Sequence, residues 1–174
     1  MIKIRFSLIC LIFAFNASSQ TKQPISIDSI SIIYNKNYRL SKKLSPIEFT
    51  DTAHDFLKLL DTQRKVYKSF NNRKISQKTK SDINQLIPFQ VLTYLDLMLY
   101  GTIKNNIDSV QLYKTKILSL TKDPGLVGES FGLSAYTYLN YNMYTKAIID
   151  FQTAYKYYKN SEKLKIQYKQ VHVL

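Results

Sequence analysis

The sequence predicts an all-α fold built from antiparallel helical hairpins. Its 174 residues contain only four Gly and four Pro, whereas a turn-rich all-β fold needs a turn about every eight to twelve residues. Apolar residues make up 45% of the chain, which is enough to bury a core and excludes general disorder. These residues recur at steps of three and four between short polar breaks, the period of amphipathic helices. The length suits one domain.

Residues 1–19 have the three-part plan of a secretory signal peptide. Two basic residues near the start precede ten mainly apolar residues, 6–15, and small residues fill 17–19. The apolar stretch is much shorter than the ~20 residues that a membrane-spanning helix needs. We therefore expect cleavage before Gln20, export to the periplasm or the medium, and no stable membrane span in the chain.

The mature chain would be strongly basic and free of cysteine. The single cysteine, Cys10, lies in the predicted signal peptide, so no disulfide or thiolate site is expected. Loss of residues 1–19 removes two of the 25 basic residues and none of the 12 acidic ones, which leaves a net charge of +11. The segment 64–80 holds seven basic residues and no acidic one.

A basic surface is typical of nucleic-acid binding, but Lys outnumbers Arg 21 to 4. Arg is the residue that makes bidentate contacts to bases and phosphates. We therefore expect solvated lysine faces and an exposed linker at 71–80 rather than a nucleic-acid partner. An anionic partner, such as an acidic protein surface or a polysaccharide, stays open.

The first mature segment, 20–44, fits two structures. Ile25, Ile27, Ile30 and Ile32 alternate as in a strand, whereas Ile27, Ile30 and Ile33 fit a helical stripe. The next helix is better defined. Ser45-Pro46-Ile47-Glu48 is a capping box with Pro at the first helical position, and apolar residues at helical spacing continue to about residue 70.

Five further helices follow from apolar spacing and from breaks between them. A helix is expected from near Ser81, through Pro88, to Gly101, and Asn105-Asn106 forms a turn. Asp123-Pro124-Gly125 is a helix breaker. The predicted helices after the first turn span 107–120, 127–141, 144–159 and a last one that starts at about Ser161.

The hairpin at 127–159 carries a repeat pattern. Aromatic and small residues stand at fixed spacings on its two helices: Phe131, Ser134, Ala135, Tyr138, Tyr144, Ala147, Phe151 and Ala154. This pattern resembles the tetratricopeptide repeat. The resemblance implies that the three alanines lie where the helices touch, that the aromatic residues pack around them, and that Asn142 adopts a left-handed turn conformation.

The resemblance extends beyond this hairpin with departures from the family pattern. Phe131 replaces the usual Trp and Ser134 the usual Leu. A weaker copy lies 37 residues earlier, within 89–124, where Gly101 stands for Tyr138 and Lys114 for Phe151. Residues 161–174 would begin a further unit. For 45–174 the resemblance implies a short right-handed solenoid, whose last helix either folds back as a cap or continues into a longer chain.

Catalytic and metal-binding patterns are sparse. Asp51, His54 and Asp55 share about one helical turn, a spacing that could hold a metal or orient an imidazole. They lie opposite the apolar stripe, so we expect a solvated charged face with Asp55–Lys58 and Asp61–Lys65 pairs. Glycines at 125, 128 and 132 lack the strand and Lys-Ser/Thr of a phosphate loop. No catalytic residue, cofactor or metal is predicted.

The tyrosine-rich hairpin points to binding. In tetratricopeptide repeats the first helix of each hairpin lines the ligand groove, so the resemblance implies roles for Asp96, Tyr136 and Asn140 on a concave face; the alternative is ordinary surface positions. We expect an exported, non-enzymatic scaffold for a protein or peptide ligand. The alternatives are a truncated extracytoplasmic sensor region of a membrane-bound signalling protein and, if His54 is essential, an enzyme. The sequence sets no oligomeric state.

Overall fold

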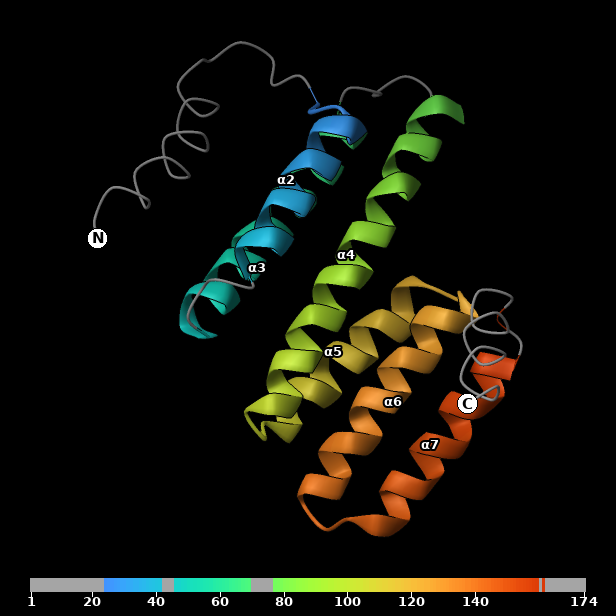
Figure 1. Cartoon of the computed structure of the whole chain (residues 1–174). Helices are drawn as coiled ribbons and strands as arrows, with labels where there is room; N and C mark the ends of the chain where they lie inside the picture. The colour runs from blue at the N-terminus through green and yellow to red at the C-terminus, as the bar shows by residue number, and fades with distance from the viewer. Residues whose placement is uncertain (1–23, 42–45, 70–76, 160, 162–174) are drawn as a thin grey trace, which may run out of the picture.

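The computed structural model describes residues 24–41, 46–69, 77–159 and 161, and every regular element in these ranges is an α-helix (Figure 1). The helices are α2 (Ile27–Ser41), α3 (Pro46–Ser69), α4 (Gln77–Ile103), α5 (Ile107–Leu120), α6 (Pro124–Asn140) and α7 (Tyr144–Lys159). The all-α prediction is confirmed for this part of the chain. The predicted signal peptide and the predicted last unit, Ser161 apart, lie outside the described residues.

Helix α2 settles the open question at the N-terminal segment. The backbone N–H of Ser29 donates to Ser26 Oγ at 3.2 Å, so Ser26 caps the helix. Just before it, the N–H of Ile25 donates to Gln63 Oε1 at 2.8 Å, and Tyr67 Oη donates to the Ile25 carbonyl at 2.8 Å. These two bonds to α3 fix the start of α2, and residues 27–41 form a helix rather than a strand.

The next two helices have one confirmed and one corrected start. Helix α3 begins at Pro46, as the capping signal predicted, although Ser45 itself lies outside the described residues. Helix α4 begins at Gln77 rather than near Ser81. Residues 77–80 are therefore helical, and the predicted linker at 71–80 was wrong there. Gln and Lys are good helix formers, and three of the four residues at 77–80 are Gln or Lys, so this segment extends the helix instead of breaking it.

Helix α6 begins three residues earlier than the sequence analysis predicted. Asp123 precedes it, and Asp123 Oδ1 accepts from the backbone N–H of Leu126 at 2.9 Å. Pro124 occupies the first helical position, where its missing N–H costs nothing. The segment 123–125 therefore ends one helix and caps the next.

The helices pack in chain order. Each helix from α3 to α7 contacts the helix before it, and the closest backbone approaches that skip one helix join α2 to α4 and α4 to α6. Single side-chain contacts also join α3 to α5 and α5 to α7. The helices α2, α4 and α6 therefore form a row, which Figure 1 shows crossing the view from blue to orange. This order divides the described residues into three hairpins, α2/α3, α4/α5 and α6/α7.

Helices α4 and α6 end in the same backbone turn. Asn105 and Asn142 have left-handed φ values of 52° and 57°. The turn bonds are Asn105 N–H to Thr102 O (3.1 Å), Asn106 N–H to Gly101 O (2.8 Å), Asn142 N–H to Leu139 O (2.9 Å) and Met143 N–H to Tyr138 O (2.9 Å). This is the Schellman pattern with Asn in place of Gly. The equivalent atoms are 37 residues apart, the spacing of the two sequence copies.

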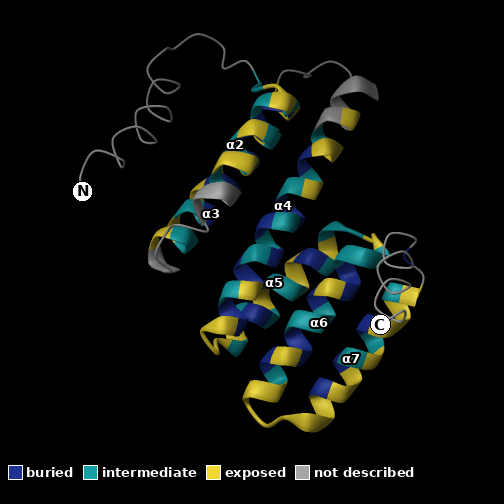
Figure 2. Cartoon of the chain, in the orientation of Figure 1, coloured by how far each residue is buried: buried dark blue, intermediate teal, exposed yellow. Residues whose placement is uncertain are grey.

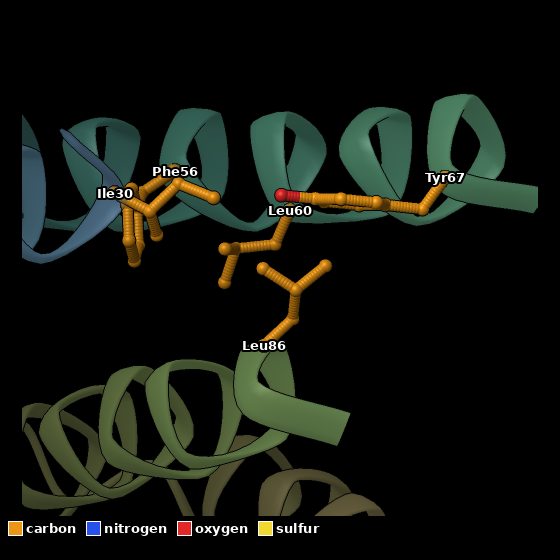
Figure 3. Close-up of a cluster of buried hydrophobic side chains, with 5 residues drawn as sticks. All are labelled: Ile30, Phe56, Leu60, Tyr67 and Leu86. Atoms are coloured by element: carbon orange, nitrogen blue, oxygen red, sulfur yellow. The ribbon is translucent and has the colours of Figure 1, made fainter. Parts of the chain in front are cut away.

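The core consists of clusters within and between the hairpins. Ile30 of α2, Phe56, Leu60 and Tyr67 of α3 and Leu86 of α4 form one cluster, in which Leu60 and Leu86 point toward each other (Figure 3). A second cluster joins α4 to α5 through Val91, Leu95, Met98, Val110 and Ile117. Residues 139–146, around the turn before α7, are all exposed (Figure 2).

One segment meets a membrane-span criterion that the sequence analysis did not single out. Ile83–Ile103 of α4 is long and apolar enough to cross a membrane, by length and composition only, with a mean hydropathy of 1.3. In this fold α4 packs against α2, α3, α5 and α6 and contributes to both large core clusters. Core packing therefore accounts for part of its apolar residues, since 44% of the span is buried in this fold.

Candidate functional site

The row of α2, α4 and α6 forms a surface, here called the first-helix face, that carries two open hollows. The larger hollow measures about 600 Å³ and lies between α4 and α6. It is lined by Leu99, Thr102, Ile103, Asn105, Leu133, Tyr136 and Asn140. Three of its apolar side chains are well exposed: Leu99 by 49%, Ile103 by 69% and Tyr136 by 58%. The lining has no charged residue, and the amides of Asn105 and Asn140 form its polar part. This hollow therefore suits an apolar side chain of a ligand.

The floor and rim of the larger hollow are held by polar contacts. Thr102 Oγ1 and Thr137 Oγ1 lie 2.9 Å apart and join α4 to α6. Asn140 Nδ2 donates to Asn105 Oδ1 at 2.8 Å, and the Tyr141 hydroxyl donates to the Asn105 carbonyl. The left-handed turn at Asn105 thus ties the end of α4 to the end of α6, which fixes the shape of the hollow.

The smaller hollow, about 340 Å³, lies where α2, α4 and α6 meet. It is lined by Tyr34, Asn35, Leu92, Leu95, Asp96 and Glu129. Tyr34 reaches across from α2, and its hydroxyl donates to Asp96 Oδ2 at 3.4 Å. Burial raises the pKa of Asp96 from 3.8 to about 6, the hydrogen bond from Tyr34 opposes this shift, and the charge of Glu129 adds to it. Two carboxylates therefore face one partly enclosed space.

The structure places all three predicted binding residues on the first-helix face. Asp96 lines the smaller hollow, and Tyr136 and Asn140 line the larger one. The sequence analysis missed Leu99 and Glu129, although helical spacing offered a signal: Leu99 follows Asp96 by three positions, and Glu129 precedes Tyr136 by seven. Tyr34 had no such signal, because only the packing of α2 on α4 brings it there.

Most of the predicted packing residues lie between α6 and its neighbours. Ala135 and Ala147 are fully buried, and Ala154 is 3% exposed. Phe131 stacks on Tyr157 with ring centres 6.0 Å apart, and Phe151 meets Tyr136 edge-on at 5.2 Å. Tyr138 lies beside two ammonium groups, Lys114 and Lys146, at 5.9 and 5.6 Å.

Tyr144 departs from the expected packing. Its side chain is 59% exposed, and its hydroxyl donates to Asn142 Oδ1 at 2.9 Å. The first position of α7 projects beyond the end of α6, so a side chain there has no facing helix to cover it. Tyr144 therefore contacts the turn rather than the core.

Two departures from the repeat pattern meet in one polar network. Lys114 Nζ donates to Ser134 Oγ at 3.0 Å and to Asp150 Oδ2 at 2.9 Å. Gln111 Nε2 also donates to Ser134 Oγ, at 2.7 Å. The Lys114 and Asp150 side chains are only 12% and 11% exposed. Buried charges must be paired, and Asp150 neutralises Lys114 while Ser134 accepts a further hydrogen bond from it. The network joins α5, α6 and α7.

The other candidate residues, His54 and the predicted ion pairs, form contacts within and between helices. His54 Nε2 lies 3.0 Å from Tyr113 Oη, between α3 and α5. The expected Asp55–Lys58 ion pair is present at 3.2 Å. The expected Asp61–Lys65 pair is wrong: Asp61 Oδ1 accepts from Gln90 Nε2 at 3.0 Å, because α4 lies close enough to compete.

No metal cluster forms in the described ranges, where His, Cys, Asp and Glu never gather in a group of three. The glycines at 128 and 132 lie inside α6, where no phosphate loop can form, and Gly125 is in its first turn. Comparison of the chain with protein-family models, curated proteins and solved structures finds no match.

Proposed function

We propose that the chain is an exported, non-enzymatic scaffold of tetratricopeptide type that binds an extended protein or peptide segment across its first-helix face. The observation that carries this proposal is the larger hollow, where Leu99, Ile103 and Tyr136 expose apolar surface between two helices. Contiguous exposed apolar surface with a polar rim is typical of interaction sites.

The repeat character is supported by two features of the backbone. The helices pack in order with α4 also touching α6, the neighbour pattern of stacked hairpins. The turns at Asn105 and Asn142 share φ values and hydrogen bonds at a separation of 37 residues. A tetratricopeptide-like unit accounts for both features with one repeated hairpin.

A peptide ligand fits this face better than a small molecule. Both hollows are open rather than enclosed, and they follow one another along the same pair of helices. An extended segment can place successive side chains in successive hollows and satisfy its backbone with Asn105 and Asn140. A sensor region of a signalling protein would use the same face, so peptide binding is the shared test.

The test is selection of binders from a displayed library of short random peptides, followed by affinity measurement of the selected peptides on variants. Leu99→Ala should weaken binding about tenfold. Leu112→Ala is the matched control, since Leu112 is 53% exposed on α5, and it should leave the affinity unchanged. Failure to select any peptide, or equal losses in the two variants, would overturn the proposal.

A further inference from the structure

The smaller hollow concentrates negative charge on a strongly basic chain. Asp96 and Glu129 line it, and no Lys or Arg does. Neither carboxylate forms an ion pair with another described residue. The chain carries 25 basic residues against 12 acidic ones, and this hollow gathers two of the acidic ones without a cation in its lining. The group that such a lining fits is a cation.

The aromatic packing of Tyr34 fixes this hollow in advance. The Tyr34 ring lies 5.8 Å from the Phe56 ring of α3 and 5.7 Å from the Phe89 ring of α4. These contacts hold the Tyr34 hydroxyl at Asp96 Oδ2 and close the hollow on the α2 side. A cation entering between Asp96 and Glu129 would meet an Asp96 carboxylate and a Tyr34 hydroxyl that are already held in place, which lowers the ordering cost of binding; the exposed Glu129 side chain can then close on it.

The two hollows are in register on both helices. On α4, Asp96 is followed seven residues later by Ile103, and on α6, Glu129 is followed seven residues later by Tyr136. Seven residues of α-helix advance about 10 Å. A polyproline II segment advances about 9 Å in three residues and returns its side chains to the same side. Side chains at positions i and i+3 of such a segment therefore match both hollows.

Resting on the peptide binding proposed above, we propose that the recognised segment carries a lysine or arginine three residues from a large apolar residue. The cation lies between Asp96 and Glu129, beside the Tyr34 hydroxyl. The apolar side chain enters the larger hollow against Leu99 and Tyr136. Either chain direction of the peptide satisfies this spacing.

The net positive charge of the chain does not prevent it from binding a peptide that carries Lys or Arg. Exposed charges farther than about 10 Å apart are largely screened at ordinary ionic strength. At contact distance the lining of the hollow decides, and its charge is negative. The composition of the chain favours an acidic partner, whereas the smaller hollow favours a basic residue in the bound peptide. The experiment below distinguishes these two expectations.

The experiment uses the peptides selected from the random library. Their sequences should be enriched in Lys or Arg three positions from Leu, Ile, Met or an aromatic residue. A synthetic peptide of the strongest binder is then compared with a copy in which the basic residue is Gln. The wild-type chain should bind the basic peptide about tenfold more tightly than the Gln copy.

Matched variants locate the effect. Asp96→Asn with Glu129→Gln should bind both peptides equally, whereas Asp51→Asn with Asp108→Asn, which removes two exposed carboxylates from α3 and α5, should keep the preference. Selected peptides enriched in Asp or Glu, or a basic preference that survives in the first double variant, would overturn this inference while Leu99-dependent binding still supports the peptide-binding function. Absence of any binder would overturn both.

Discussion

Lys114 and Asp150 show how a buried charge is tolerated in this fold. The pair spans α5 and α7 at 2.9 Å, and the Lys114 ammonium also lies 4.9 Å from the centre of the Phe131 ring. Ser134 supplies a further oxygen from α6. The ammonium thereby donates to two side-chain oxygens, and the polar network replaces the apolar contact that the repeat pattern would place there.

Removal of one partner of this pair should be costly. Lys114→Ala leaves Asp150 buried without a cation, and the free energy of unfolding should fall by about 3 kcal/mol. Lys58→Ala is the control, because the Lys58–Asp55 pair is 78% and 53% exposed and should matter by less than about 0.5 kcal/mol. Urea denaturation measures both. Similar losses in the two variants would show that the Lys114 pair is not a structural contact.

Burial of the Asp96 carboxylate lowers the stability of the folded chain when that carboxylate is ionised. Its pKa is about 6 in the folded chain against 3.8 unfolded, so the folded state holds the proton more tightly. The contribution of Asp96 to stability is therefore favourable below about pH 4 and lost as the pH rises through 6. Tyr34 and Glu129 are the groups that face it.

Asp96→Asn should raise stability at pH 7.5 by about 1 kcal/mol, a value reduced for the partial exposure of the carboxylate. Most of the gain should be lost at pH 3.5, where the wild-type carboxyl is protonated in the folded state and mostly protonated in the unfolded state. Asp51→Asn on exposed α3 surface serves as the control. Thermal unfolding at the two pH values gives the comparison, and an equal gain at both would mean that charge is not the cause.

The candidate site was only partly predictable at the level of residues. Asp96, Tyr136 and Asn140 followed from the repeat resemblance, which assigns positions on the first helices. Glu129 could have followed from helical spacing, since it precedes Tyr136 by seven positions. Tyr34 could not, because only the packing of α2 on α4 brings it to the smaller hollow. The polar network at Lys114 was also hidden: the sequence showed two separate departures, and only the packing of α5 on α6 reveals that they are one feature.

At the scale of elements, Gly128 of α6 lies in tight contact with α7. A Cβ added there would lie 2.8 Å from two ring carbons of Tyr158 and 3.3 Å from the Ala154 carbonyl oxygen. At Gly132, one turn further along α6, the nearest atom would be Tyr158 Oη at 3.6 Å, an ordinary contact. Both glycines are helical, but only Gly128 is too close to α7 to accommodate a Cβ without a shift.

Gly128→Ala should lower the free energy of unfolding by about 1–2 kcal/mol, because α7 must move away. Gly132→Ala should raise it by up to about 1 kcal/mol, since Ala is the better helix former and has room. Urea midpoints of the two variants test the close approach. A stabilising Gly128→Ala would show that α7 does not pack there as the structure has it.

Helix existence was easier to predict than helix boundaries. The spans 107–120 and 144–159 agree with α5 and α7, because Asn turns and apolar periodicity mark both ends. The start of α6 was missed, since Asp123-Pro124 ends one helix and caps the next with the same residues. The structure of α2 was undecidable from its isoleucines alone; its contacts with Gln63 and Tyr67 of α3 fix where it begins.

At the scale of the whole molecule, the proposal of export makes a separate prediction. Residues 1–19 have the plan of a signal peptide, so the exported protein should begin at Gln20. Intact mass and N-terminal sequencing of the protein from the exported fraction check this. Retention of Met1 in that fraction would contradict cleavage and favour an N-terminal anchor.

The three hairpins align α2, α4 and α6 in one row, and we propose that this row is a peptide-binding face. Helix α7 offers a built-in comparison: Tyr155 is 63% exposed there and Ile148 is 55% exposed, close to the exposure of the residues in the larger hollow. General stickiness of exposed apolar groups would involve α7 as much as the first-helix face.

The most direct measurement is therefore amide chemical-shift mapping during titration with the strongest selected peptide. Peptide binding at the first-helix face predicts that the shifted amides cluster around Asp96, Leu99, Tyr136 and Asn140. The chemical shifts of the Ile148 and Tyr155 amides should not change. Shifts centred on the exposed side of α7, with the first-helix face unmoved, would contradict this prediction.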